Sequence, residues 1–414
     1  MSSRSIDRAA RPRTTALPIL DRAARRIMLA AARRIQVGRL TIVLPDGTRE
    51  VVGGDGGPVA EIRIHDERGA IRMLLGGETG AGEGFTDGLW SSPDLAALLR
   101  LAALNRDALA LSSGWWRRLA GIPRVLAHRA RRNTVRQASR NIRRHYDLGN
   151  DFYRLFLDET MTYSSAVFDR PDQSLADAQR NKYRVMAERA GLRPGMRVLE
   201  IGSGWGGFAL HAAGELGCDV TSITISPAQQ ALATERIAAA GLEDRARVEL
   251  RDYRAIDGTY DAIVSIEMLE AVGHEYFPAF FEACDRALEP GGRLSLQTIT
   301  FPDASYEAQR RGANWIQTYI FPGGLLPSLA VIERATAATS LLITGTQDIA
   351  ASYARTLATW RATFHAHLDE VRALGFDERF IRMWDYYLAI SEAGFATGIT
   401  QDQQLILEKR RGIG

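Results

Sequence analysis

A glycine-rich segment in the second half of the chain has the residue types and spacing of a ligand-binding loop. It reads Glu200-Ile-Gly-Ser-Gly-Trp-Gly-Gly-Phe208, with four glycines in the six positions 202–207. Glycine tolerates the positive φ angles of a tight turn and, lacking a Cβ, lets a ligand approach the backbone closely. Such a loop is typical of the strand-to-helix turns that bind nucleotides. Taken alone, the pattern fits a nicotinamide cofactor as well as other nucleotides.

The segments that follow this loop depart from the dinucleotide pattern. No Asp or Glu ends the next predicted strand, which continues as Thr224-Ile-Ser-Pro-Ala-Gln229, so a ribose contact falls to hydroxyl or amide groups. Asp252 and Tyr253 could hold an adenine by hydrogen bonding and stacking, and Glu267-Met-Leu-Glu270 follows the fourth predicted strand. This arrangement favours S-adenosylmethionine, and with it a methyltransferase, over a nicotinamide enzyme.

Five short apolar segments, separated by stretches of helical periodicity, must position these residues. Repeated strand and helix units of this kind predict an α/β fold, a Rossmann-like class I methyltransferase domain whose sheet is doubly wound and mostly parallel. Ligands of such sheets bind at the carboxyl ends of the strands, where the glycine loop is expected. The strands are expected at 197–201, 220–224, 246–250, 260–265 and 293–297.

A small α+β domain is predicted from residues 38–113, ahead of a methyltransferase domain at 146–414 that also holds lipid-pocket helices. Strand segments separated by Gly- and Pro-containing turns come first, and a helical run preceded by Asp94 as a plausible cap closes the small domain. The strands are expected at 40–44, 62–64 and 71–75, and the helix at 95–104.

Residues 1–37 form a basic amphipathic segment with a helical pattern over 17–35. A basic amphipathic helix can lie on a membrane surface. An Arg-rich transit peptide is the alternative interpretation.

Charge is distributed unevenly along the chain. The formal net charge is +3, yet residues 1–145 hold 26 Arg and 13 acidic residues. Residues 114–145 alone contain ten Arg and no acid, with Trp115 and Trp116 near the front, and are interpreted as an Arg-rich linker helix. Arg side chains can pair with lipid phosphates and Trp side chains favour the membrane–water interface, so this segment suits an anionic phospholipid surface. A solvated basic helix and a nucleic-acid contact are the alternatives.

Neither a membrane span nor a metal site is expected from the sequence. The apolar runs are too short to cross a bilayer. The two cysteines, Cys218 and Cys284, show neither a CxxC motif nor the spacing of metal ligands. We therefore expect a reducing, cytoplasmic compartment, with peripheral association at the inner membrane surface.

Seven segments from His145 onward occur in an order that is specific to one family. They include His145-Tyr-Asp-Leu-Gly-Asn150 and Met161-Thr-Tyr-Ser-Ser-Ala166, and then 198–208, 223–230, 267–273, 319–324 and 386–395. In these segments the chain resembles the cyclopropane-fatty-acyl-phospholipid synthase and mycolic-acid methyltransferase family. Residues 38–104 also resemble the N-terminal domain of the bacterial members that modify phospholipids, which favours an intact phospholipid as substrate.

The resemblance implies a reaction in which the cis double bond of an acyl chain takes the methyl group of S-adenosylmethionine. A carbocation results, and in the family a bound bicarbonate ion removes a proton so that a cyclopropane ring closes. Aromatic faces can stabilise such a cation, and the site must exclude water. The implied cosubstrate is S-adenosylmethionine, the implied ion is bicarbonate, and the implied partner is an unsaturated phospholipid in an anionic membrane.

The resemblance also assigns residues to the site. Bicarbonate would be held by Glu270, Tyr353, the backbone at Ile299, and the groups at Ser165 and Gln297. The bacterial synthases generally have Cys and His at the last two positions, although plant-type members share the Gln. Cofactor contacts are implied for Tyr163, Ser164, Glu200, Gly202, Gly204, Gly206, Thr224, Gln229, Asp252 and Tyr253.

Three classes of function are compatible with the sequence. The first is a lipid-modifying enzyme, for which we expect a cyclopropane product and keep a methyl- or methylene-branched chain as the alternative. A nucleic-acid methyltransferase is a second class, disfavoured because the fourth strand is followed by Glu267-Met-Leu-Glu270 rather than an Asn-Pro-Pro-Tyr-like motif. A lipid-binding protein without activity is a third. A homodimer is expected from the family alone.

Overall fold

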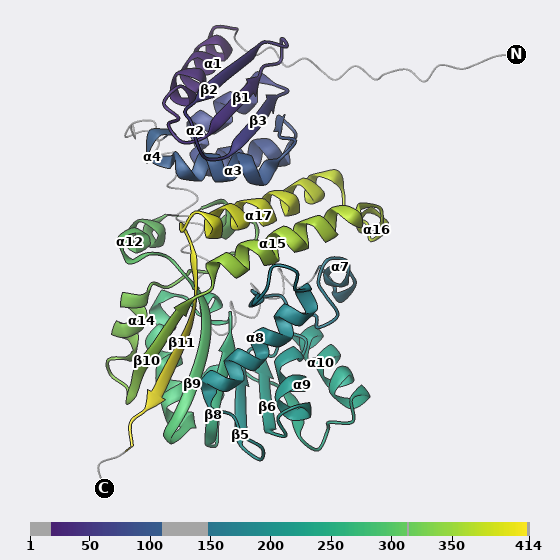
Figure 1. Cartoon of the computed structure of the whole chain (residues 1–414), viewed down its shortest axis with the longest axis vertical. Coiled ribbons are helices and arrows are strands. Elements are labelled where there is room, and N and C mark those ends of the chain that lie inside the picture. The colour runs from purple at the N-terminus through teal and green to yellow at the C-terminus, as the bar shows by residue number, and fades with distance from the viewer. Residues whose placement is uncertain (1–17, 110–147, 313, 412–414) are drawn as a thin grey trace, which may run out of the picture.

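The computed structural model describes residues 18–109, 148–312 and 314–411 and consists of a small and a large domain (Figure 1). The small domain lies at one end, and the large domain holds the remainder of the described chain. Of the sequence predictions, the linker helix at 114–145 and the front of the N-terminal segment lie outside the described residues.

The small domain is a four-stranded sheet covered by helices, in agreement with the predicted α+β class. Its strands follow the order β2-β1-β3-β4, with β1 and β3 parallel. The predicted helix at 95–104 is confirmed, and the Asp94 side chain caps it by accepting a hydrogen bond from the Ala97 amide. The elements are β1 (Arg39–Val43), β2 (Arg49–Gly53), β3 (Val59–Ile64), β4 (Trp90–Ser91), α1 (Pro18–Ala32), α2 (Glu67–Thr86), α3 (Leu95–Leu104) and α4 (Arg106–Leu109).

The strand predicted at 71–75 is wrong, because these residues lie inside helix α2. Five apolar residues are too few to separate a strand from a helix by periodicity alone. The helix starts at Asp66, whose side chain accepts a hydrogen bond from the Arg68 amide and so satisfies a free N–H of the first turn. Helix α2 kinks at Gly77, which has φ 56° and ψ −136°.

The N-terminal helical pattern forms α1, which contacts α2. Ala24, Ala31 and Ala32 are buried, and Ile35 just beyond the helix belongs to the core of the small domain. These residues of α1 therefore lie against protein while Ile27 is exposed, and contact with a membrane surface stays a prediction.

The large domain is built on a seven-stranded sheet in the order β10-β11-β9-β8-β5-β6-β7. The five predicted strands correspond to β5 to β9, which pair in parallel as expected of a doubly wound sheet. Two further strands were not predicted: β11 pairs antiparallel with both β9 and β10. The strands are β5 (Arg197–Ile201), β6 (Asp219–Thr224), β7 (Ala246–Leu250), β8 (Tyr260–Ile266), β9 (Leu288–Thr300), β10 (Leu341–Asp348) and β11 (Gln401–Lys409).

Helices cover the sheet and close its carboxyl edge. Helices α8, α9 and α10 pack on strands of the sheet through one apolar cluster, and α11 and α14 pack through another. The long helices α15 and α17 run side by side between the sheet and the small domain (Figure 1). The helices are α7 (Asn150–Arg154), α8 (Leu175–Ala190), α9 (Gly207–Gly214), α10 (Pro227–Ala239), α11 (Phe277–Ala287), α12 (Asp303–Arg311), α13 (Trp315–Tyr319), α14 (Leu329–Thr336), α15 (Ala350–Ala366), α16 (Leu368–Ala373) and α17 (Glu378–Ala396), with 3₁₀ turns η1 (Tyr253–Ala255), η2 (Leu269–Ala271) and η3 (His274–Tyr276).

The small domain docks on α17 through close packing and ion pairs. Arg100 of α3 reaches Glu392 of α17 at 3.2 Å, and Arg379 of α17 reaches Asp87 at 3.1 Å. Gly82 of α2 lies so close to the large domain that a Cβ there would fall 2.5 Å from the Trp315 ring. The interface therefore fixes α2 against the helices that cover the sheet edge.

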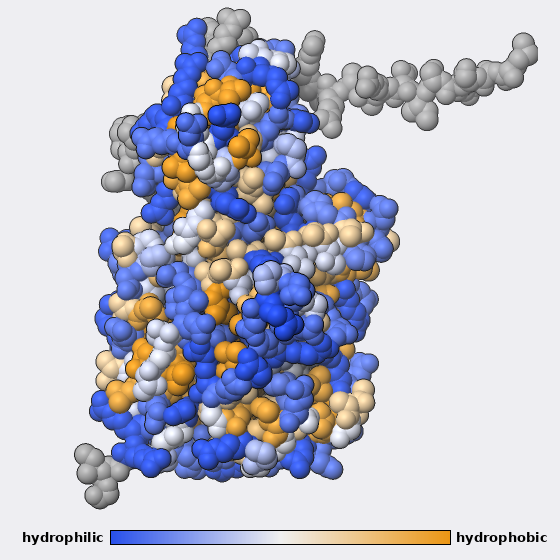
Figure 2. Space-filling view, viewed as in Figure 1, coloured by the Kyte–Doolittle hydropathy of each residue, from blue (hydrophilic) through white to orange (hydrophobic). Residues whose placement is uncertain are grey.

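No helix within the described ranges combines the length and the apolar character needed to cross a membrane. Figure 2 shows apolar side chains in separate patches on a face that is mainly hydrophilic.

Candidate active site

A cavity of about 400 Å³ opens at the carboxyl ends of the parallel strands, in the size range of small-molecule sites. At one end it is lined by the glycine loop, and at the other by residues of α15 and α17. Most of the predicted site residues line it; Gly206 of the cofactor set and Ser165 and Gln297 of the bicarbonate set do not. The predicted residues on its wall are Tyr163, Ser164, Glu200, Gly202, Gly204, Thr224, Gln229, Asp252, Tyr253, Glu270, Ile299 and Tyr353.

The glycine loop has the geometry that its sequence predicts. Gly202, Gly204 and Gly206 all have positive φ, and no atom lies within 4 Å of the position that a Cβ on Gly204 would take. The backbone at Gly204 is therefore open to a ligand. The amides of Gly202 and Ser203 both donate to the Ile223 carbonyl at 3.0 Å, which ties the loop to β6.

Glu200, the residue before the last of β5, places a buried carboxyl beside this loop. The Ser222 hydroxyl donates to it at 2.5 Å. Burial raises the pKa of Glu200 to about 8, while the Ser222 hydrogen bond and the Lys182 charge oppose the rise. A cation placed beside Glu200 favours its ionised form. The residue is thus suited to a positively charged part of a ligand.

The ends of β6 and β7 supply polar groups on the same side of the cavity. The Thr224 hydroxyl donates to the Gln229 side chain at 2.8 Å, and Ser226 caps α10. Asp252 forms an ion pair with Arg254 at 2.7 Å, and Tyr253 packs on Phe280. The Tyr253 hydroxyl is buried without a hydrogen-bond partner in the described chain, so it can serve a ligand.

Aromatic and aliphatic side chains form the other end of the cavity. Tyr163 stacks on Trp360 with ring centroids 5.3 Å apart, and Tyr353 stacks on Phe395 at 4.2 Å. Such faces stabilise a nearby cation, and apolar walls exclude water. The apolar lining includes Ile316, Phe321, Leu325, Leu326, Leu357 and Ile390.

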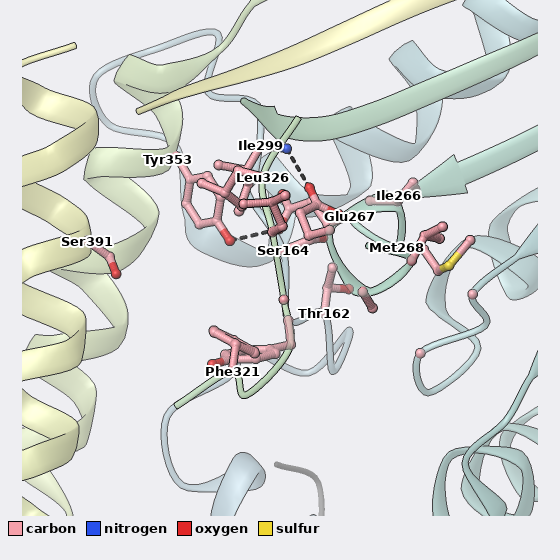
Figure 3. Close-up of a pocket in the computed structure, with 18 of the residues that line it drawn as sticks. Thr162, Ser164, Ile266, Glu267, Met268, Ile299, Phe321, Leu326, Tyr353 and Ser391 are labelled. Atoms are coloured by element: carbon pink, nitrogen blue, oxygen red, sulfur yellow. Dashed lines mark hydrogen bonds between the residues drawn. The ribbon is translucent and has the colours of Figure 1, made fainter. Parts of the chain in front are cut away.

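Glu267 lies where these two ends meet, directly after β8. Its carboxylate accepts hydrogen bonds from a donor cluster of three groups: the Ser165 amide at 2.8 Å, the Gln297 side-chain amide at 2.8 Å and the Tyr353 hydroxyl at 2.7 Å. Figure 3 shows Tyr353 and Glu267 facing one another on the wall of the cavity. Glu267 also has φ 49°. Such backbone strain in a residue other than glycine concentrates at functional sites.

The orientation of the Gln297 side chain follows from its neighbours. Its carbonyl oxygen accepts a hydrogen bond from Gln404 at 2.9 Å, so its amide nitrogen points to Glu267 and to Asp402. Gln297 lies on β9, and Gln404 and Asp402 lie on the adjacent β11. The Ser165 hydroxyl is directed elsewhere, to the Ala166 carbonyl, so Ser165 contributes its backbone amide and not its side chain.

Glu270 has a different environment. Its Oε1 accepts from the Ile299 amide at 2.5 Å and the Thr298 hydroxyl at 2.9 Å, while its buried Oε2 has no partner among the described residues. Burial and the nearby Glu267 charge raise the pKa of Glu270 to about 8. Glu270 therefore favours its neutral form at neutral pH.

The buried cation Lys182 partly compensates nearby buried acids, among them Glu200, Glu267 and Asp402. Lys182 of α8 is fully buried and donates to the Ser164 hydroxyl at 2.5 Å. Burial lowers the pKa of Lys182 to about 8, although the Glu267 charge opposes this. Burial raises the pKa of Glu267 and of Asp402, and the Lys182 charge opposes both shifts.

These contacts also test whether the residues implied to hold bicarbonate fit that ion. The donors among them are the Ser165, Gln297, Tyr353 and Ile299 groups, and each is already bonded to a carboxylate of the chain. Close carboxylates also repel a further anion. The residues as arranged do not fit a bound bicarbonate.

Three important residues of the site were missed as such from the sequence. Glu267 had a usable signal, since it follows a predicted strand directly. Lys182 lies in a helix of ordinary polar composition, and Asp402 lies on an unpredicted strand, so neither had a local signal.

Sheet order, glycine loop and buried carboxyls together define an S-adenosylmethionine-dependent methyltransferase of the Rossmann-like class. A family model described as mycolic acid cyclopropane synthetase matches residues 133–405. The chain belongs to this family.

Named relatives agree with this assignment. Tuberculostearic acid methyltransferase of Mycobacterium tuberculosis is 42% identical over 87% of this chain and 85% of its own length. Cyclopropane-fatty-acyl-phospholipid synthase of Escherichia coli is 33% identical over 87% of this chain and 91% of its own length. A solved mycolic acid cyclopropane synthase in complex with SAH and CTAB is 33% identical, with a TM-score of 0.62 over 66% of this chain and 98% of that one. The protein is thus an enzyme that methylates lipid acyl chains with S-adenosylmethionine.

Proposed function

We propose that the enzyme transfers the methyl group of S-adenosylmethionine to the cis double bond of an unsaturated phospholipid acyl chain and forms a cyclopropane. The observation that carries this proposal is the continuity of one cavity, from the open glycine loop to an aromatic and aliphatic end, with Glu267 between them. An alkene can lie at the aromatic end beside the methyl donor. There, tyrosine and phenylalanine faces stabilise the carbocation that follows methyl transfer.

An intact phospholipid as the acceptor is supported by the small domain and by the relatives. The synthase of Escherichia coli, whose name specifies fatty-acyl phospholipid, matches 87% of this chain, a span that exceeds the large domain. The basic residues 114–145 support docking on an anionic bilayer from the cytoplasmic side. A homodimer remains a prediction.

A branched acyl chain is the second candidate product. It is favoured by the relative named tuberculostearic acid methyltransferase, at 42% identity. In this case the cation rearranges before it loses a proton, and a double bond remains in the product.

Mass spectrometry of acyl chains distinguishes the candidates after the enzyme is incubated with S-adenosylmethionine and anionic vesicles of mono-unsaturated phospholipid. A gain of one CH₂ unit without a reducible double bond supports cyclopropanation, whereas the same gain with a reducible double bond supports branching. No gain on any unsaturated lipid contradicts the proposed function. Turnover is expected to weaken as salt screens the anionic surface, and equal turnover on free fatty acid at high salt would count against membrane docking.

A further inference from the structure

We infer that the Glu267 carboxylate is the proton acceptor of this reaction and replaces an exogenous anion. The inference rests on the proposed function, since it assigns one step of that reaction. Three donors from separate parts of the chain converge on Glu267: one precedes α8, one is on β9 and one is on α15. A base held in this way needs no reorganisation when the cation forms.

The contacts of Glu267 orient it as a base. Both carboxylate oxygens are engaged, Oε1 by Ser165 and Gln297 and Oε2 by Tyr353. Gln297 is itself held by Gln404. These contacts fix the carboxylate on the wall of the cavity that the glycine loop also lines. The next residue, Met268, approaches that loop, since a Cβ on Gly202 would lie 3.1 Å from the Met268 side chain.

The surrounding charges also distinguish Glu267 from the other two acids. Glu270 favours its neutral form, and Asp402 does not line the cavity. Burial raises the pKa of Glu267 as well, but the Lys182 charge and three hydrogen-bond donors, which engage both carboxylate oxygens, oppose that rise and favour the ionised form. A sulfonium or carbocation entering the cavity favours the carboxylate further.

The chemical step balances without another reagent. The π electrons of the alkene form a bond to the methyl carbon while the carbon–sulfur bond breaks, which leaves S-adenosylhomocysteine and a carbocation on the acyl chain. Glu267 then takes a proton from the transferred methyl group. The electrons of that C–H bond close the ring or, after a hydride shift, form the double bond of a methylene branch. Glu267 returns the proton to water once the products leave.

Two substitutions of Glu267 separate its role as a base from its role in filling space. Glu267→Gln keeps the shape and removes the base, so product formation should fall by about 100-fold or more. Glu267→Gly relieves the positive φ and frees the donor cluster, so its activity should be low and should rise about tenfold or more with added bicarbonate. The wild-type rate should not depend on bicarbonate. Glu243→Gln, at an exposed glutamate outside the cavity, is the matched control.

Binding of ¹³C-labelled bicarbonate, followed by NMR in the presence of S-adenosylhomocysteine, supplies a test apart from turnover. We expect binding by Glu267→Gly and none by the wild type; S-adenosylhomocysteine binding and the melting temperature report whether the variants fold. Bicarbonate binding or bicarbonate-dependent turnover in the wild type would overturn the inference, as would full activity of Glu267→Gln. A wild type that modifies no lipid contradicts the proposed function instead, while the binding comparison still decides whether the donor cluster excludes bicarbonate.

Discussion

Replacing Tyr353 by phenylalanine tests the electrostatics of the site with a minimal change of shape. The substitution removes the hydroxyl that donates to Glu267 at 2.7 Å and keeps the ring that stacks on Phe395 at 4.2 Å. A hydrogen bond to a charged group contributes about 1.5 to 3 kcal/mol, and one pKa unit corresponds to about 1.4 kcal/mol. The pKa of Glu267, already raised by burial, should therefore rise further by about 1 to 2 units.

The expected result is a shift of the pH–rate profile. Because the ionised carboxylate is the active form, the rate falls as pH falls through the pKa of Glu267. The Tyr353→Phe profile should move to higher pH by about 1 to 2 units, with a rate about 10- to 100-fold lower on the acidic side and recovery in alkali. Lys182, Glu270 and Asp402 face the same carboxyl and are unchanged in this variant.

The measurement is single-turnover product formation on vesicles as a function of pH. Tyr387→Phe is the matched control, since the Tyr387 hydroxyl bonds to Tyr163 at 2.8 Å and lines the same cavity. An acidic limb that does not move in Tyr353→Phe, or that moves equally in Tyr387→Phe, would refute the assignment.

Three further outcomes are expected. Binding of S-adenosylmethionine near pH 7 should release up to about one proton, because a cation near Glu200 lowers the pKa of that carboxyl from about 8. Calorimetry in buffers of different ionisation heat measures the proton release, and binding heats that do not depend on the buffer would contradict it. The free energy of unfolding should decrease as pH rises from about 4.5 to 8, by at most about 1.4 kcal/mol per pH unit for each of Glu200 and Glu270. The reason is that the raised pKa values of these two groups let the folded state bind more protons than the unfolded chain in this pH range. Urea titrations at several pH values test the sign of this dependence, and a free energy of unfolding that increases with pH would contradict it. Gly82→Ala should lower the melting temperature because its Cβ would meet the Trp315 ring at 2.5 Å, whereas Gly76→Ala in the same helix meets nothing within 4 Å and should be neutral or slightly stabilising; equal melting temperatures would argue against a tight domain interface.

Much of the large domain could be predicted because its signals are local. Each of β5 to β9 contains a short, mainly apolar run next to a helical pattern, and the glycines after β5 indicate a tight turn whatever surrounds it. Residues 71–75 show where local signals fail, because five residues cannot separate the periodicity of a strand from that of a helix. Here the segment continues a helix that is capped at Asp66. Strands β10 and β11 gave no clear signal of their own, although their pairing closes the sheet.

The sequence by itself determined which residues gather at the carboxyl edge, because parallel strands bring their ends to one side. It did not determine which acid meets the donors. Ser165, Glu267, Gln297 and Tyr353 are separated by tens of residues in the chain, and their contacts depend on the packing of α15 on the sheet edge and on the strained φ of Glu267. The sequence and the family resemblance pointed to Glu270, three positions away. Only the tertiary structure distinguishes the two, because hydrogen bonds a few ångströms long depend on the relative placement of distant segments.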